Sequence, residues 1–224
     1  MRVIIFLVVL GLCCSCRTPQ SNDSSVRSTN ARPNVGRVEW IPNPEAVPDP
    51  SPALANVFAP WDGHWKGSFR IFQDTSGLET HPAKVRIEDP NYILKGPFKE
   101  TMQIAVEQFY ESTNPWRQTV KIIDTYTDGS GQVQKVESSG FNVVVGDSLF
   151  CIVNKPDEQV VHTGITRDPQ IIIWERDLRT PLKIEYFFEQ VQGDTYSILG
   201  WGYYGEDDPL KGPKSWFYGE YVKQ

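Results

Sequence analysis

The sequence predicts an all-β domain built as an up-and-down antiparallel β-barrel of about ten strands. Two observations favour strands: short stretches of alternating or β-branched residues recur between turn signals, and no segment has a convincing amphipathic helix pattern. A third observation, the short connections, favours pairing between successive strands. Because closure of such a sheet removes its exposed edges, we expect a barrel, with a two-sheet sandwich as the alternative.

The first expected strand, Trp65–Phe72, places Trp65, Gly67, Phe69 and Ile71 on one face. Propensity alone would also allow a helix over Met102–Tyr110. Turn clusters such as Asp128-Gly129-Ser130-Gly131 separate the remaining segments. The other expected strands are Ala83–Glu88, Met102–Glu111, Thr119–Tyr126, Gln132–Glu137, Phe141–Val145, Leu149–Val153, Glu158–Thr166, Gln170–Glu175, Leu182–Val191, Tyr196–Tyr204 and Trp216–Val222.

Residues 1–16 have the pattern of an export signal. Arg2 is followed by an apolar run that is too short to span a membrane, and the run ends at Leu12-Cys13-Cys14-Ser15-Cys16. This segment resembles the lipobox of bacterial lipoproteins, with Cys16 as the acylated cysteine and Cys14 as the weaker candidate. The resemblance implies a membrane anchor through acylated Cys16 in the bacterial cell envelope, at the outer membrane because Arg17 rather than Asp follows. An ordinary secretory signal cleaved near Ser15 is the alternative.

Residues 17–55 are expected to be a flexible tether, and residues 56–224 the barrel domain. The tether is rich in Pro, Ser and Asn, so it cannot bury enough apolar surface to fold alone, although Val38–Ile41 could dock on the domain. Cys151 is the one cysteine of the domain, which excludes an internal disulfide. The formal net charge of −6 argues against a nucleic-acid partner, which requires a basic face.

The segment Trp61-Asp62-Gly63-His64-Trp65-Lys66-Gly67-Ser68-Phe69 resembles the first barrel strand of the calycins, the group that contains the lipocalins. The carrying motif is Gly-x-Trp, here Gly63-His64-Trp65. The segment is also similar to a poorly characterised lipocalin-like family of cyanobacteria and plants, related in fold to lyases that attach bilins. The resemblance implies that Trp65 plugs the narrow end of the barrel, and that a cation from its end packs on this ring. Lys223 or Lys214 would serve, since the last strand has no Arg.

Other motifs provide no complete active site. Gly146-Asp147-Ser148-Leu149 spells the motif of the GDSL hydrolases, but the one later histidine, His162, follows Gln159 instead of the Asp that their Asp-x-x-His requires. We interpret Gly146-Asp147 as a two-residue hairpin turn and expect no enzyme activity. The histidines have no metal-ligand spacing. Haem-binding barrels of the nitrobindin type share Trp-x-Gly, but their proximal-histidine segment has no counterpart here, so no metal or cofactor is expected.

These observations predict a membrane-tethered lipoprotein that binds a small hydrophobic or amphipathic ligand of the lipid, isoprenoid or tetrapyrrole class inside its barrel. Strand alternation assigns Trp65, Phe69 and Ile71 to the deep end of the cavity. Tyr186, Trp201 and Tyr203 are assigned to its mouth. The alternative is a non-enzymatic structural or interaction lipoprotein with a fully packed barrel and a partner on its aromatic exterior.

Overall fold

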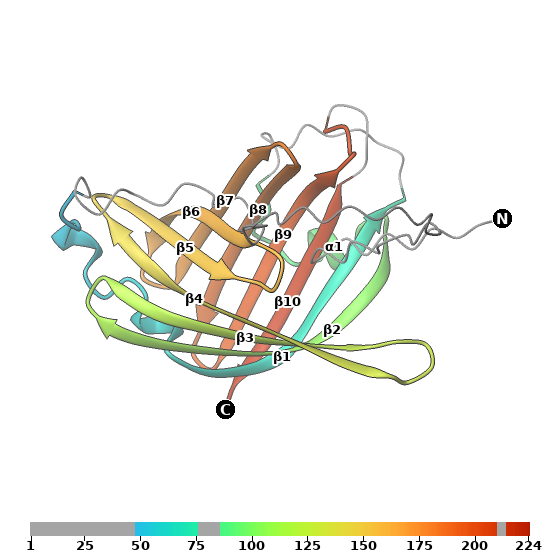
Figure 1. The fold of residues 1–224 in the computed structure, drawn as a ribbon, viewed down its shortest axis with the longest axis horizontal. Helices are drawn as coiled ribbons and strands as arrows, with labels where there is room; N and C mark the ends of the chain where they lie inside the picture. The colour runs from blue at the N-terminus through green and yellow to red at the C-terminus, as the bar shows by residue number, and fades with distance from the viewer. Residues whose placement is uncertain (1–47, 76–85, 210–213) are drawn as a thin grey trace, which may run out of the picture.

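Ten antiparallel strands close into a single barrel in the computed structural model, which describes residues 48–75, 86–209 and 214–224 (Figure 1). Each strand pairs with its neighbours in the chain, and β1 pairs with β10 to complete the closure. The expected up-and-down barrel is therefore the observed fold. The strands are β1 Gly63–Asp74, β2 Phe98–Asn114, β3 Arg117–Thr127, β4 Val133–Val145, β5 Ser148–Asn154, β6 Gln159–Asp168, β7 Ile171–Arg179, β8 Leu182–Gln192, β9 Thr195–Gly205 and β10 Ser215–Lys223.

Met102–Glu111 is strand, as expected, because it pairs with β1 up to Tyr110 and with β3 from Ala105 onward, so the helix that propensity would also allow does not form. Two other segments differ from the sequence-based expectation. The two segments expected on either side of Ser138–Gly140 form the single strand β4, since these small residues pair with β3 without a break. In the expected strand at Ala83–Glu88, residues 83–85 lie outside the described part and residues 86–88 are not strand. Ile87 packs instead on the outer face of the barrel.

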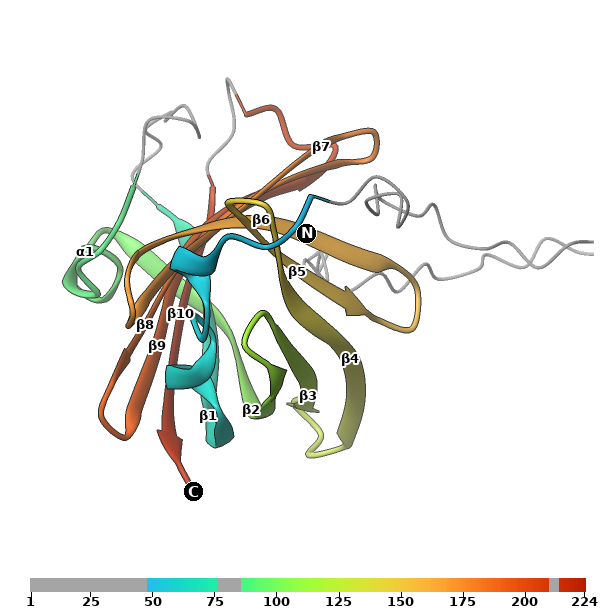
Figure 2. The same cartoon turned by 90° about the vertical axis from the view of Figure 1, so that its left-hand side faces the viewer.

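Residues 48–62 form a cap over one end of the barrel, built around the 3₁₀ turns η2 (Pro52–Leu54) and η3 (Ala59–Trp61). In Figure 2 this blue segment crosses the barrel end that faces the viewer. The Ser51 amide donates to the Gly146 carbonyl at 2.9 Å, so the ordered domain begins before residue 56, where the tether was expected to end. The export signal, Cys16 and Val38–Ile41 lie outside the described residues.

A buried hydrogen-bond network holds the cap on the barrel. The Asp62 carboxylate accepts from the amide and hydroxyl of Ser112, both at 2.9 Å, and from the Gln118 side chain at 2.8 Å. Gln118 also donates to the Phe58 carbonyl, and its oxygen accepts from the Asn142 amide. Gln118 is completely buried, so loss of any of these partners would leave polar atoms unsatisfied.

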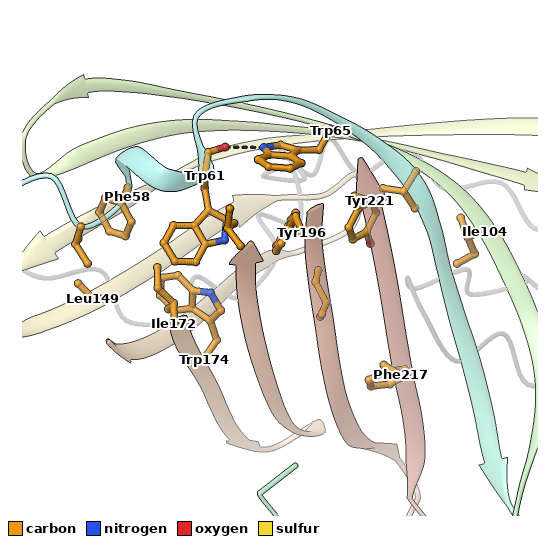
Figure 3. Packing of buried hydrophobic residues seen from close by; sticks show 14 of the residues in the cluster. Phe58, Trp61, Trp65, Ile104, Leu149, Ile172, Trp174, Tyr196, Phe217 and Tyr221 are labelled. Atoms are coloured by element: carbon orange, nitrogen blue, oxygen red, sulfur yellow. Dashed lines mark hydrogen bonds between the residues drawn. The ribbon is translucent and has the colours of Figure 1, made fainter. Parts of the chain in front are cut away.

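The barrel wall has a hydrophobic cluster on each face. The inner cluster includes Phe58, Trp61, Trp65 and Trp174 (Figure 3). The outer cluster lies on β7–β10 and β1 beneath residues 86–98, which include the short helix α1 (Asn91–Leu94). Its members are Phe72, Ile87, Ile93, Ile173, Ile184, Tyr186, Phe188, Leu199, Trp201, Tyr203, Trp216 and Tyr218. Within the described residues, no helix is long and apolar enough to cross a membrane.

Inward-facing glycines make room for the aromatic rings of the interior. A Cβ added at Gly164 would lie 2.3 Å from the Trp174 ring, and one at Gly200 would lie 2.5 Å from the Phe187 ring. A Cβ added at Gly202 would likewise lie 2.6 Å from the Tyr204 side chain, and one at Gly219 would lie 2.7 Å from the Tyr221 side chain. Each large ring therefore lies against a bare stretch of backbone, so the rings fit inside a closed sheet without overpacking it.

Replacement of Gly67 by Ala is expected to destabilise the barrel by about 2–4 kcal/mol, because the closing strand pair leaves no room for a side chain. A Cβ at this position would lie 1.9 Å from the Glu220 carbonyl oxygen of β10. The midpoint of urea unfolding measures the effect. Gly129→Ala is the control, since nothing lies within 4 Å of a Cβ there. Equal midpoints for the two variants would contradict this account of closure.

Candidate ligand-binding cavity

The interior of the barrel contains a cavity of about 180 Å³. All strands except β5 and β7 contribute to its wall, which combines apolar and ionisable side chains. The apolar and aromatic part of the wall consists of Phe69, Ile104, Val106, Ile122, Tyr126, Val160, Phe187, Ile198, Tyr204, Phe217 and Tyr221. The polar part consists of Gln108, Asp124, Ser138, His162, Glu185, Glu189 and, in the loop after β5, Lys155.

Of the six side chains expected to bind ligand, only Phe69 lines this cavity. Trp65 and Ile71 face the interior as expected, but they belong to the packed inner cluster and not to the cavity wall. Tyr186, Trp201 and Tyr203 do not line the cavity, which corrects their assignment to its mouth. They lie on the outer face of the barrel because their neighbours Phe187 and Tyr204 face inward and side chains alternate along a strand.

Trp65 closes the capped end of the barrel. Its ring is fully buried, and its indole nitrogen donates to the Trp61 carbonyl at 2.6 Å (Figure 3). The Lys223 ammonium lies 5.2 Å from the ring centroid, at the position where a cation was expected. Lys214, the other candidate, contacts the outer-face rings of Trp201 and Trp216 instead. Trp65 therefore belongs to a packed layer at the capped end and does not line the cavity.

A chain of ion pairs occupies the part of the interior farther from the cap. The Glu185 carboxylate contacts the His162 ring at 2.9 Å and the Arg176 guanidinium at 3.4 Å, and it accepts from the Tyr204 hydroxyl at 2.8 Å. Arg176 also pairs with Glu158, which contacts Lys183. Burial alone would raise the pKa of Glu185, but His162, Arg176 and Lys155 hold it well below its usual range. Glu185 therefore stays ionised with its charge compensated.

Glu189 lies nearer the capped end, four residues along β8 from Glu185 and on the same inward face. Burial raises its pKa to about 7, against smaller opposing contributions from the neutral polar groups of Trp174 and Tyr196. Two further shifts occur across the cavity, where burial raises the pKa of Asp124 and lowers that of Lys155. The cavity therefore contains a carboxyl group that changes its charge near neutral pH.

Alternation along β8 carries a signal that sequence reasoning missed. In Ile184-Glu185-Tyr186-Phe187-Phe188-Glu189, the two glutamates share a face with Phe187, and Tyr186 shares the opposite face with Phe188. The aromatic face was expected to point inward, but in the structure it is the face with the glutamates that lines the cavity. The second apolar layer over the outer face explains this, because it buries Tyr186 and Phe188 outside the barrel.

The Gly146-Asp147 pair forms the expected two-residue hairpin turn, since Val145 pairs with Ser148 and Gly146 has a φ of 57°. Ser148 begins β5 with its side chain exposed. His64 lies on the outer surface, where it contacts Glu107 at 3.0 Å and stacks on Phe109. In the part of the chain that the structure describes, no group of three or more His, Cys, Asp or Glu side chains is placed to hold a metal ion.

Solved structures match most of this chain at low sequence identity. Rv2717c from M. tuberculosis superposes with a TM-score of 0.50 at 12% identity, over 79% of this chain and 99% of that one. A redesigned β-barrel matches at a TM-score of 0.35 and 10% identity, over 76% of this chain and 97% of that one. At such identities the likeness concerns the fold alone. No family model and no curated protein sequence matches the chain.

The raised pKa of Glu189 predicts that its ionisation destabilises the fold. The pKa in the folded state, about 7, lies above the ordinary value of 4.5, so the stabilising contribution is complete below about pH 4.5 and is lost as the pH rises through 7. Relative to Glu189→Gln, the unmodified protein should lose about 2–3 kcal/mol of unfolding free energy between pH 5 and pH 8. Urea unfolding of both proteins at the two pH values measures this difference.

The exposed strand residue Glu111 supplies the control for this experiment. Glu111→Gln should follow the unmodified protein at both pH values, because the replaced carboxyl group is in water in the folded and unfolded states alike. Parallel pH profiles for Glu189→Gln and the unmodified protein would show that Glu189 titrates normally.

Proposed function

We propose that the protein binds a small amphipathic molecule inside its barrel and acts as a carrier or receptor for it. The observation that carries this proposal is the cavity of about 180 Å³, closed at one end by the Trp65 layer and lined by both apolar and ionisable side chains. Ligand sites in proteins commonly combine an apolar wall with a few well-placed polar groups. Burial of the apolar part of the ligand would supply the affinity, at about 25 cal/mol per Å².

The cavity volume limits the size of the ligand. An engineered protein cavity of about 150 Å³ accommodates benzene, whereas sites for drug-sized molecules usually measure about 300–1,000 Å³. The volume of about 180 Å³ is therefore suited to one aromatic ring with a short polar substituent. Within the ligand classes expected from the sequence, this favours a small amphipathic molecule over a tetrapyrrole or a long-chain lipid.

The aromatic exterior favours the binding function over a structural one. Most outer-face aromatic residues of β8–β10 are covered by the protein's own residues 86–98, and Tyr92 of that segment lies 5.3 Å from Trp216. Among the described residues, the exposed large hydrophobic side chains are Tyr92 and Leu94 of α1 and the single residues Val133, Ile165 and Val222, which lie on separate strands or strand ends. A packed barrel with a partner on its aromatic exterior thus has less support than a ligand-binding barrel.

The proposal also includes the cellular context inferred from the first 16 residues. Export and acylation of Cys16 would hold the barrel at the surface of a bacterial membrane, with the residues before the cap as the tether. Two or more acyl chains are enough for stable attachment without a membrane-spanning helix. We also propose that the barrel is related to the lipocalins. The Gly63-x-Trp65 motif at the start of β1 and the Lys223 ammonium near the Trp65 ring support this relationship.

Filling the cavity is expected to abolish binding without unfolding the protein. Val106 lines the wall and is buried, so Val106→Phe places a ring in the space that the ligand would occupy. We expect at least a tenfold loss of affinity for 2-phenylethanol, measured by isothermal titration calorimetry, together with loss of any small molecule that organic solvent extracts from the purified protein. Overpacking should cost about 1–3 kcal/mol of stability.

Val222→Phe is the matched control, because Val222 is exposed and lies outside the cavity. It should bind 2-phenylethanol as the unmodified protein does. If Val106→Phe does not fold, Val160→Phe in β6 tests the same wall from another strand. Unchanged binding by a folded cavity variant would overturn the proposal.

Acylation of Cys16 predicts a clear change in fractionation. In a bacterial host grown with an alkyne-labelled palmitate, the unmodified protein should carry the label and sediment with membranes, whereas Cys16→Ala should lose the label. Cys14→Ala is the control and should keep it. Loss of the label in Cys14→Ala alone would move the anchor to that cysteine, and an unlabelled wild-type protein would point to an ordinary secretory signal.

A further inference from the structure

Some carboxyl groups that line the cavity have positively charged side chains of the protein beside them, and one does not. Glu185 is matched by His162 and Arg176, both within 3.4 Å. Across the cavity, the main charges acting on Lys155 are those of Glu185, Glu158, Asp124 and Arg176, and Lys155 is the cation that acts on Asp124. These groups form one mutually compensated set, and Glu189 is the carboxyl group outside it.

Glu189 is surrounded by groups that carry no positive charge. The polar groups that favour its charged form are neutral, the Trp174 indole and the Tyr196 hydroxyl. The side chain also borders the cavity, so a ligand can reach the carboxyl group. Four ionisable groups on other strands interact electrostatically with Glu189. They are Tyr110 of β2, Cys151 of β5, Tyr196 of β9 and Tyr221 of β10. Asp124 of β3 in turn interacts with Tyr221.

Buried polar atoms without partners border the same cavity. The Ser138 hydroxyl and the Tyr126 hydroxyl have no hydrogen-bond partner among the described residues, and Ser138 is only 3% exposed. An unsatisfied buried hydroxyl costs about 1–3 kcal/mol, so such atoms in a cavity wall are suited to a ligand that carries hydrogen-bonding groups. These two hydroxyls and Glu189 therefore present polar groups to the same enclosed space.

We propose that the ligand is a small amphipathic amine whose ammonium group pairs with the Glu189 carboxylate. This inference rests on the proposed function and specifies its ligand. An ammonium ion would supply the counter-charge that the protein does not, whereas an anion would add a second negative charge in a site of low polarity. The nearby Tyr221 ring adds an aromatic surface that attracts a cation. The apolar body of the amine would lie against Val106, Ile122 and Ile198.

Three probes of nearly equal size and different charge test this inference on the purified protein. They are 2-phenylethylamine, 2-phenylethanol and phenylacetate, each with one ring and a short polar substituent that suits the cavity volume. By calorimetry at pH 8, the amine should bind at least tenfold more tightly than the alcohol and more tightly still than the carboxylate. In Glu189→Gln, the affinity for the amine should no longer exceed the affinity for the alcohol.

The pH dependence provides a second readout. The amine stays protonated between pH 6 and pH 8, but the fraction of Glu189 that is ionised falls about tenfold over this range, given its pKa of about 7. Amine affinity should fall by the same factor from pH 8 to pH 6, and alcohol affinity should not change. Glu111→Gln, an exposed control, should keep both the preference for the amine and its pH dependence.

The possible outcomes separate this inference from the proposed function. If the alcohol or the carboxylate binds as tightly as the amine, the barrel binds ligands but the inference about charge is overturned. If the amine is preferred equally by the unmodified protein and Glu189→Gln, Glu189 is not its partner and the inference again fails. If none of the three probes binds, the inference and the proposed function fail together.

Discussion

Closure of the sheet between β1 and β10 is the constraint on which the rest of this structure depends. It brings the two strands so close at Gly67 that the Glu220 carbonyl occupies the place of a side chain. Once the pair forms, every strand has a paired neighbour on both sides, and side chains face either the interior or the outside. The separation of an inner and an outer hydrophobic cluster, and the existence of a cavity in the interior, follow from this closure.

A barrel of ten strands has more interior than its packed core uses. The Trp61, Trp65 and Trp174 side chains fill the capped end, and rings that lie against inward-facing glycines fill part of the remainder. Four of the seven aromatic residues of β8 and β9 lie in the outer cluster with Ile87 and Ile93, and so do not contribute to filling the barrel. The unfilled interior is the cavity, and its small volume reflects how many rings point inward.

Electrostatics gives this cavity its chemical character. A charged group in such an interior is stable only when a partner compensates it, and Glu185 has such partners in His162 and Arg176. The groups that favour the charged form of Glu189 are neutral, and its raised pKa expresses the cost of an uncompensated charge. Residues that reduce the stability of a fold in this way are often found where a protein binds its ligand.

The sequence by itself determined the class of fold, most strand positions, the Gly146-Asp147 turn and the inward orientation of Trp65, because alternation and turn chemistry act over a few residues. It also placed Phe69 at the cavity. Only the tertiary structure decided which face of β8 and β9 points inward, because Tyr186-Phe187-Phe188 has apolar residues on both faces. The choice depends on residues 86–98, which cover the outer face of the barrel and are distant in sequence. Only the tertiary structure also showed that Glu189 has no counter-charge, because the groups around it come from β2, β5, β7, β9 and β10, which closure of the barrel brings together.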